Sequence, residues 1–108
     1  MSAEDQAQTP VTIQKQSAHL LDDLKRVRVS LTFKDATLQT TVNLSLHTGD
    51  DAVISSASIL GVLNNRVDFT LHTGKQPIGD LLVLKVQVLD GNGDLMLESS
   101  TPVAVPGR

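Results

Sequence analysis

The chain has no cysteine, no tryptophan and no tyrosine, and only two phenylalanines among its 108 residues. The absence of cysteine excludes disulfides, thiolate metal sites and cysteine nucleophiles. The shortage of aromatic rings argues against recognition by stacking, whether of bases, sugars or proline-rich peptides. A chain of this length can still fold around one core, because it buries roughly 60 to 70% of its unfolded surface.

Charge and apolar runs are also modest. Nine basic and twelve acidic side chains give a formal net charge of −3 and are spread along the chain instead of forming blocks. Because nucleic-acid binding usually needs a basic face, we expect no nucleic-acid partner. The longest apolar run, residues 81–84, is far below the ~20 residues that span a bilayer, so we expect no membrane insertion.

The amino terminus reads as a mobile leader over residues 1–10, followed by a single domain over residues 11–108. The leader is polar and slightly acidic, and it has neither a basic n-region nor an apolar h-region. We therefore expect no signal peptide and a cytoplasmic location. A cysteine-free surface module fits the same features.

A ten-residue pattern occurs twice, at residues 42–51 and 67–76. Each copy alternates apolar and polar residues and then reads His-Thr-Gly, with the histidines at His47 and His72. This pattern is typical of a half-buried β-strand that ends in a turn.

Alternation of apolar residues predicts further strands. Residues 27–33 and 38–46 form a predicted hairpin around Lys34-Asp35, with both apolar sets on one face. Residues 17–24 fit either an N-capped helical turn or an extended approach to the next strand. The other expected strands are a short edge at 11–13, a strongly apolar strand at 81–89, its partner at 95–98 and a last edge at 103–105.

The segment from Asp50 to Leu63 fits neither the helical nor the strand period cleanly. Its β-branched residues and serines are modest or poor helix formers, so we predict a strand with a bend near residues 55–58 or at Gly61. The following Asn64-Asn65 suits a type I′ turn and predicts a hairpin with residues 67–71.

About seven or eight short strands without a long helical pattern predict an all-β fold, an antiparallel two-layer β-sandwich. It would be immunoglobulin-like in the broad sense, because the inter-sheet disulfide, buried tryptophan and tyrosine corner are missing. A small β-barrel is the alternative architecture.

Two sets of side chains are candidate metal ligands. Asp90, Asn92 and Asp94 match the start of a calcium loop, but a glycine and a bidentate glutamate are missing from its later positions. A β-turn needs the same residue types, and this interpretation is favoured.

His47 and His72 are the second set of candidate metal ligands. An intervening strand would hold them roughly 9.6 Å apart, too far to share an ion, whereas a helical crossover would make them neighbours.

Catalytic and phosphate-binding motifs are not evident. The sequence has no Gly-x-Ser-x-Gly elbow and no glycine-rich phosphate loop, and nothing singles out one pair of carboxylates. We therefore expect no enzymatic activity and no cofactor.

A basic cluster is followed by a polar stretch, comprising Lys25, Arg26 and Arg28, then Asn43, Ser45 and Gly49. Together they loosely resemble the arginines and the Asp/Asn-x-Ser-x-x-Gly stretch of the PilZ family of cyclic dinucleotide binders. The glycine stands one position late and the paired-arginine spacing is not met. The resemblance implies a small-ligand binder as one alternative function.

The sequence thus favours a non-enzymatic sandwich that acts by protein association or self-association, through an edge strand or a sheet face. The alternatives are the PilZ-like cyclic dinucleotide binder and a calcium-dependent surface module.

Overall fold

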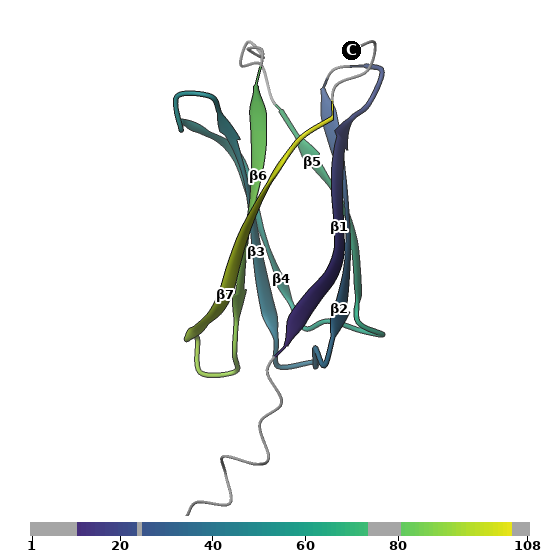
Figure 1. Cartoon of the computed structure of the whole chain (residues 1–108), viewed down its shortest axis with the longest axis vertical. Coiled ribbons are helices and arrows are strands. Elements are labelled where there is room, and N and C mark those ends of the chain that lie inside the picture. The colour runs from purple at the N-terminus through teal and green to yellow at the C-terminus, as the bar shows by residue number, and fades with distance from the viewer. Residues whose placement is uncertain (1–10, 24, 74–80, 105–108) are drawn as a thin grey trace, which may run out of the picture.

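The computed structural model describes residues 11–23, 25–73 and 81–104. Its strands are β1 (Thr12–Leu20), β2 (Arg26–Lys34), β3 (Thr41–Thr48), β4 (Val53–Leu60), β5 (Arg66–His72), β6 (Leu82–Leu89) and β7 (Leu95–Pro102). They form two facing sheets, with the orders β1-β2-β5 and β4-β3-β6-β7 (Figure 1). All strand pairs within these sheets are antiparallel. The predicted two-layer sandwich is therefore confirmed, and two separate sheets decide against the barrel.

The placement of β4 distinguishes this sandwich from an immunoglobulin constant domain. In constant domains the fourth strand joins the sheet of the first, second and fifth strands. Here β4 pairs with β3, in the other sheet. The sheet β4-β3-β6-β7 consequently has β4 at one edge and β7 at the other (Figure 1).

The core lies between the sheets and follows the period of two. Burying each aliphatic side chain contributes roughly 1.5–3 kcal/mol relative to exposure. The predicted inward positions of β2, β3 and β6 are confirmed, since all of them are almost fully buried: Val27, Val29, Leu31, Phe33, Val42, Leu44, Leu46, Leu82, Leu84, Val86 and Val88. Leu38 was also predicted to face inward, but it is 68% exposed and lies outside any strand.

The predicted hairpin between residues 27–33 and 38–46 is wrong. β2 pairs with β1 and β5, whereas β3 pairs with β4 and β6. Residues 35–40 carry the chain from one sheet to the other, starting with Asp35 at φ 67°. The alternation of apolar and polar residues determines which face of a strand is buried. Because both facing sheets bury their apolar faces, the alternation does not determine to which sheet a strand belongs.

The helical-turn interpretation of residues 17–24 is wrong as well, because residues 17–20 belong to β1. β1 spans nine residues instead of the short edge expected at 11–13. It pairs with β2 along almost its whole length, with a bulge between Ile13 and Lys15. Pairing of the backbone with β2 outweighs the weak local preferences of this segment.

The strand prediction for residues 50–63 is confirmed by β4. Its bulge falls at Ile54, since Leu46 faces Ser55 while His47 faces Val53.

The turn that follows is confirmed, but the hairpin predicted around it is not. Asn64 and Asn65 both have φ 57°, and Arg66 N donates to Leu63 O at 3.2 Å. Beyond this single bridge β5 pairs with β2 instead of β4. Gly61 allows the crossing, because its φ is +90° and a Cβ there would lie 3.0 Å from the Leu38 carbonyl oxygen.

The hairpin of β6 and β7 is confirmed, with β7 longer than predicted. Of the predicted last edge at 103–105, Ala104 forms a parallel bridge with His19, and residue 105 lies outside the described residues. The leader at 1–10 and the loop expected at 74–80 lie outside them too.

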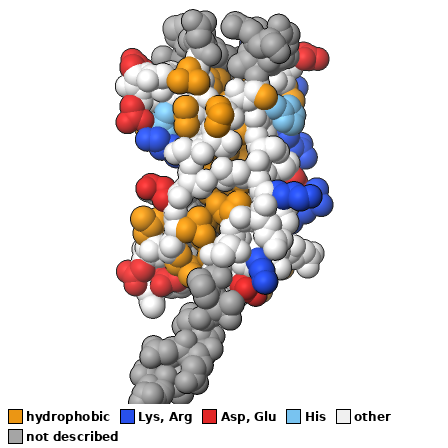
Figure 2. All heavy atoms as spheres, in the orientation of Figure 1, with side chains coloured by type: hydrophobic (Ala, Val, Ile, Leu, Met, Phe, Trp, Pro, Cys, Tyr) orange, Lys and Arg blue, Asp and Glu red, His pale blue; other side chains and the backbone are white. Residues whose placement is uncertain are grey.

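Charged side chains divide between the two sheets. Figure 2 shows red acidic groups mainly along the side of the four-stranded sheet and blue basic groups mainly along the side of the three-stranded sheet. Within the described residues, no helix is long and apolar enough to cross a membrane.

Candidate functional site

The two histidines of the repeated pattern lie in different sheets. His47 is in β3 and faces outward from the four-stranded sheet, because its strand neighbours Leu44 and Leu46 alternate into the core. His72 ends β5 and is exposed on the outer side of the other sheet, opposite Arg26. The prediction that one strand separates them within a single sheet is therefore wrong. With the core between them, they cannot bind one ion together.

The acidic turn at residues 90–94 uses its first carboxylate locally. Asp90 Oδ1 accepts hydrogen bonds from the backbone N–H groups of Asn92 (2.8 Å) and Asp94 (3.0 Å). Gly93 has φ +86°, a conformation that suits glycine. This is the geometry of a hairpin turn stabilised by an aspartate side chain. Among the described residues, no group of three or more His, Asp or Glu side chains could hold a metal ion.

The residues that resemble the PilZ pattern are divided by the core. Arg28 is exposed on the outer side of the three-stranded sheet, since Val27 and Val29 beside it point inward. Asn43 and Ser45 alternate with the buried residues of β3 and so face outward from the four-stranded sheet. This arrangement does not form one nucleotide site.

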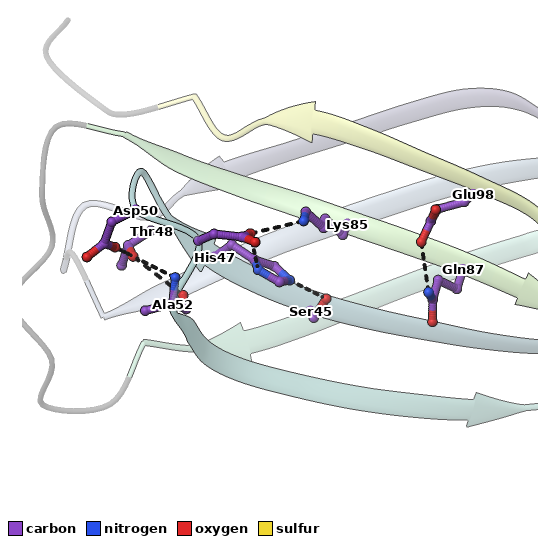
Figure 3. Close-up of polar contacts among 9 residues, drawn as sticks. Ser45, His47, Thr48, Asp50, Ala52, Lys85, Gln87 and Glu98 are labelled. Atoms are coloured by element: carbon purple, nitrogen blue, oxygen red, sulfur yellow. Dashed lines mark hydrogen bonds and ion pairs between the residues drawn. The ribbon is translucent and has the colours of Figure 1, made fainter.

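A polar network surrounds His47 on the outer face of the four-stranded sheet (Figure 3). Its Nε2 lies 2.9 Å from the Ser45 hydroxyl, and its Nδ1 lies 3.0 Å from Asp51 Oδ1. Lys85, on the neighbouring strand β6, donates to the same Asp51 oxygen at 3.0 Å. His47 Nδ1 is buried and has no hydrogen-bond partner, so its contact with Asp51 is a close approach of the two groups.

The turn after β3 places Asp51 in this network. Thr48 N donates to Ala52 O and Asp51 N to Thr48 O, both at 2.9 Å, and Asp51 has φ 70°. The Lys85 ammonium, by hydrogen bond and charge, lowers the pKa of the Asp51 carboxyl. The Thr48 hydroxyl donates to Asp50 and lowers the pKa of that carboxyl. The turn thus holds two ionised carboxylates at one end of the sheet.

Serine, histidine and aspartate in this order match the residue types of a hydrolase triad. Acyl transfer also requires N–H donors aimed at the developing oxyanion. Here Ser45 lies in a central strand, paired with Ser56 on one side and Lys85 on the other, so its neighbouring backbone N–H groups belong to the sheet. Beside Ser45, the described strands therefore offer no free pair of backbone N–H groups for an oxyanion.

Edge strand β4 is the other unusual feature of this sheet. It contains no charged residue and no proline, and four of its eight residues are serine or alanine. The other edges carry the features that usually block further pairing, namely Lys15 in β1, Arg66 and Asp68 in β5, and Glu98 and Pro102 in β7. Only the bulge at Ile54 interrupts the β4 edge.

A shallow polar hollow of about 530 Å³ lies beside this edge, on the outer face of the sheet. It is lined by side chains from the paired strands and one from β6, namely Asn43, Ser45, Val53, Ser56, Ser58 and Gln87, with Leu44 and Ala57 beneath them. Ser58 donates to Asn43 at 2.6 Å across the strand pair. Most of the side chains that line this hollow are short, so they leave β4 accessible.

Sequence reasoning missed the contact of Ser45 and Lys85 with this network. The spacing of Ser45 and His47 is a usable signal, because residues two apart in a strand share a face. Asp51 follows His47 by four residues and contacts it through the turn after β3. Nothing in the sequence places Lys85 there, since that contact depends on the pairing of β3 with β6.

Comparison with known proteins supports the fold alone. No family model matches the chain, and no curated protein matches it in sequence. Among solved structures, it is similar to the β-glucuronidase of Parabacteroides merdae, with a TM-score of 0.62 and 14% identity over 89% of this chain. The β-glucuronidase of Bifidobacterium dentium gives a TM-score of 0.56 and 12% identity over the same share. The chain spans only 14% and 17% of those two proteins.

Proposed function

We propose that this chain is a non-enzymatic β-sandwich module that acts by protein association, with the β4 edge as the surface that accepts a strand of the partner. The observation that carries the proposal is an eight-residue edge strand without a charge or a proline, in a fold whose other edges have them. Strand addition to such an edge supplies affinity through the backbone and specificity through alternate side chains.

The backbone direction of β4 supports this role. Gly61 N donates to Thr40 O at 2.9 Å, in register with the pairing of β3 and β4. Because hydrogen-bonding direction alternates along an antiparallel strand, the even-numbered residues Ser56 and Ser58 turn their N–H and C=O groups away from β3. A partner strand would pair with these groups.

Exposed leucines lie where the β4 edge ends. Leu60 is 82% and Leu63 is 66% exposed, and both flank Gly61, whose backbone approaches exposed Leu38. Exposed apolar groups beside an unpaired edge add burial to backbone pairing. This combination favours association over a solvent-facing structural role.

Peptide selection tests the proposal. Random ten-residue peptides would be displayed against the unmodified chain and two variants, Ser56→Lys and Ser100→Lys. Ser56 and Ser100 are both exposed outer-face residues, one on each edge strand of the four-stranded sheet, so the second variant controls for added charge. We expect extended peptides with alternating aliphatic residues to bind the unmodified chain and S100K.

Binding of the same peptides to S56K should be about tenfold weaker, or ~1.4 kcal/mol, because lysine at an edge opposes strand addition. If no peptide is selected, or if both lysine variants bind equally well, the proposal is overturned.

The non-enzymatic part has its own test. A fluorophosphonate probe should leave Ser45 unmodified, because its neighbourhood lacks oxyanion donors. Stoichiometric labelling of Ser45 that is lost in a His47→Ala variant would contradict it. Mass spectrometry of the intact chain measures either outcome.

A further inference from the structure

We infer that the strand which pairs with β4 is β4 of a second copy of this chain, around a two-fold axis that passes beside Ala57. This inference rests on the proposed function, because it names the partner of the same edge. A two-fold interface must be complementary to itself. If one residue of the first copy contacts a second residue of the other copy, the same contact occurs with the two copies exchanged. The β4 edge meets this condition in its composition, its charge and its backbone.

The composition of β4 reads the same in both directions. Two aliphatic residues, Val53 and Ile54, precede four small residues at 55–58, and two aliphatic residues, Ile59 and Leu60, follow them. In antiparallel pairing around Ala57, small residues meet at the centre, Ala57 with Ala57 and Ser56 with Ser58, and the aliphatic Ile54 meets Leu60. β7 lacks this property, because it is apolar at its start and polar at its end.

Charge also favours a second copy. A charged residue near the centre of an edge strand would approach its own copy across a two-fold axis, and like charges close to each other are destabilising. β4 has none. The nearest carboxylate of the polar network, Asp51, is already paired with Lys85.

The register follows from the faces of β4. Ser56 and Ser58 face outward, whereas Ala57 and Ile59 pack against the core. Directly opposite residues of paired strands share a face, so an axis beside Ala57 sets Ser56 opposite Ser58 of the second copy.

The axis beside Ala57 also uses the free backbone groups. Ser56 and Ser58 are the residues whose N–H and C=O groups point away from β3. Each of the two Ser56–Ser58 pairs would exchange two hydrogen bonds, which gives about four across the axis. The result is a continuous eight-stranded sheet that crosses both copies.

Sedimentation equilibrium of charge-reversed variants tests both the partner and the register. The unmodified chain and S100K should sediment at twice the monomer mass of 11.5 kDa. S56K alone and S58E alone should each dissociate, with a dimer dissociation constant about tenfold or more higher, because lysines or glutamates gather at the axis. Mixed in equal amounts, S56K and S58E should reassemble as a heterodimer, since each lysine then faces a glutamate.

Cysteine cross-linking gives a second readout that does not depend on charge. The chain has no native cysteine, and residues opposite each other on the axis lie about 4.5 Å apart at Cα, within reach of a disulfide. An Ala57→Cys variant should oxidise to a covalent dimer. Ser99→Cys, on the opposite edge strand β7, should form no covalent dimer at the same concentration.

The outcomes separate this inference from the proposed function. A monomeric unmodified chain at millimolar concentration overturns the inference, while peptides selected on the same edge would still support strand addition. A dimer that survives S56K, or a mixture of S56K and S58E that fails to reassemble, also overturns it. Circular dichroism of each variant checks that the sandwich is folded.

Discussion

The two lateral sides of the sandwich differ in how the edges of the sheets meet. On the β1 and β7 side, Leu20 N donates to Ala104 O at 2.8 Å and Ala104 N donates to Ala18 O at 2.9 Å. On the same side, Gln16 of β1 donates a side-chain hydrogen bond of 2.9 Å to Ser99 of β7. On the β4 and β5 side, no backbone hydrogen bond joins the two strands where the structure describes them.

This difference shows that the fold closes one side with its own carboxyl-terminal residues and leaves the other side available. Ala18 and Ala104 are small, which allows the backbones on the closed side to approach. On the open side, the chain crosses between the sheets at Gly61 and the asparagine turn, so β4 and β5 separate instead of pairing. An unpaired, uncharged strand results.

The largest expected effect contrasts one leucine from each side. Leu20 on the closed side is 3% exposed, whereas Leu60 on the open side is 82% exposed. We expect Leu20→Ala to lower the free energy of unfolding by about 2–5 kcal/mol, because it leaves a cavity. Leu60→Ala should change the free energy of unfolding of the monomer by less than about 0.5 kcal/mol.

Urea denaturation in the S56K background measures both values without a contribution from association. Equal losses for the two substitutions would contradict the assignment of a closed and an open side.

A smaller effect concerns the turn that leads into β4. The pKa of Asp51 is lowered in the folded chain, chiefly by the Lys85 hydrogen bond, from the ordinary value of 3.8. As the pH falls, the unfolded chain is therefore protonated at this carboxyl first. The stabilisation by Asp51 is present above pH 3.8 and is lost as the pH falls through its lower folded pKa.

Replacement of Asp51 by asparagine should therefore flatten the dependence of Tm on pH below the ordinary carboxyl pKa of 3.8. Thermal unfolding at a series of pH values measures it, with Asp94→Asn in the opposite turn as the control. If D51N keeps the steepness of the unmodified chain, the Lys85 contact does not stabilise the turn.

Local features of this fold could be predicted from the sequence because they depend on neighbouring residues. The alternation in residues 82–88 identified the inward faces, and Asn64-Asn65 identified a turn that needs two positive φ angles. The sheet to which each strand belongs could not be predicted, because it depends on distant contacts. Asn65, for example, accepts hydrogen bonds from Phe33 and Ala36, 32 and 29 residues away, at the crossing between the sheets.

The candidate site was predictable to a similar extent. The spacing of Ser45 and His47 puts both on one face of a strand, and the neutral composition of residues 53–60 is visible in the sequence. That this stretch lies at an edge is a property of the strand order, in which β5 leaves β4 to pair with β2. Only the structure shows that order.

Hydrogen exchange at the β4 edge tests the central claim most directly. The amides of Ser56 and Ser58 point away from β3, so they should exchange rapidly in dilute solution and become protected as the chain concentration rises. In S56K they should exchange rapidly at every concentration. Fast exchange of these two amides in the unmodified chain up to millimolar concentration, or protection that does not depend on concentration, would contradict the account of β4 as a strand that pairs with a second copy.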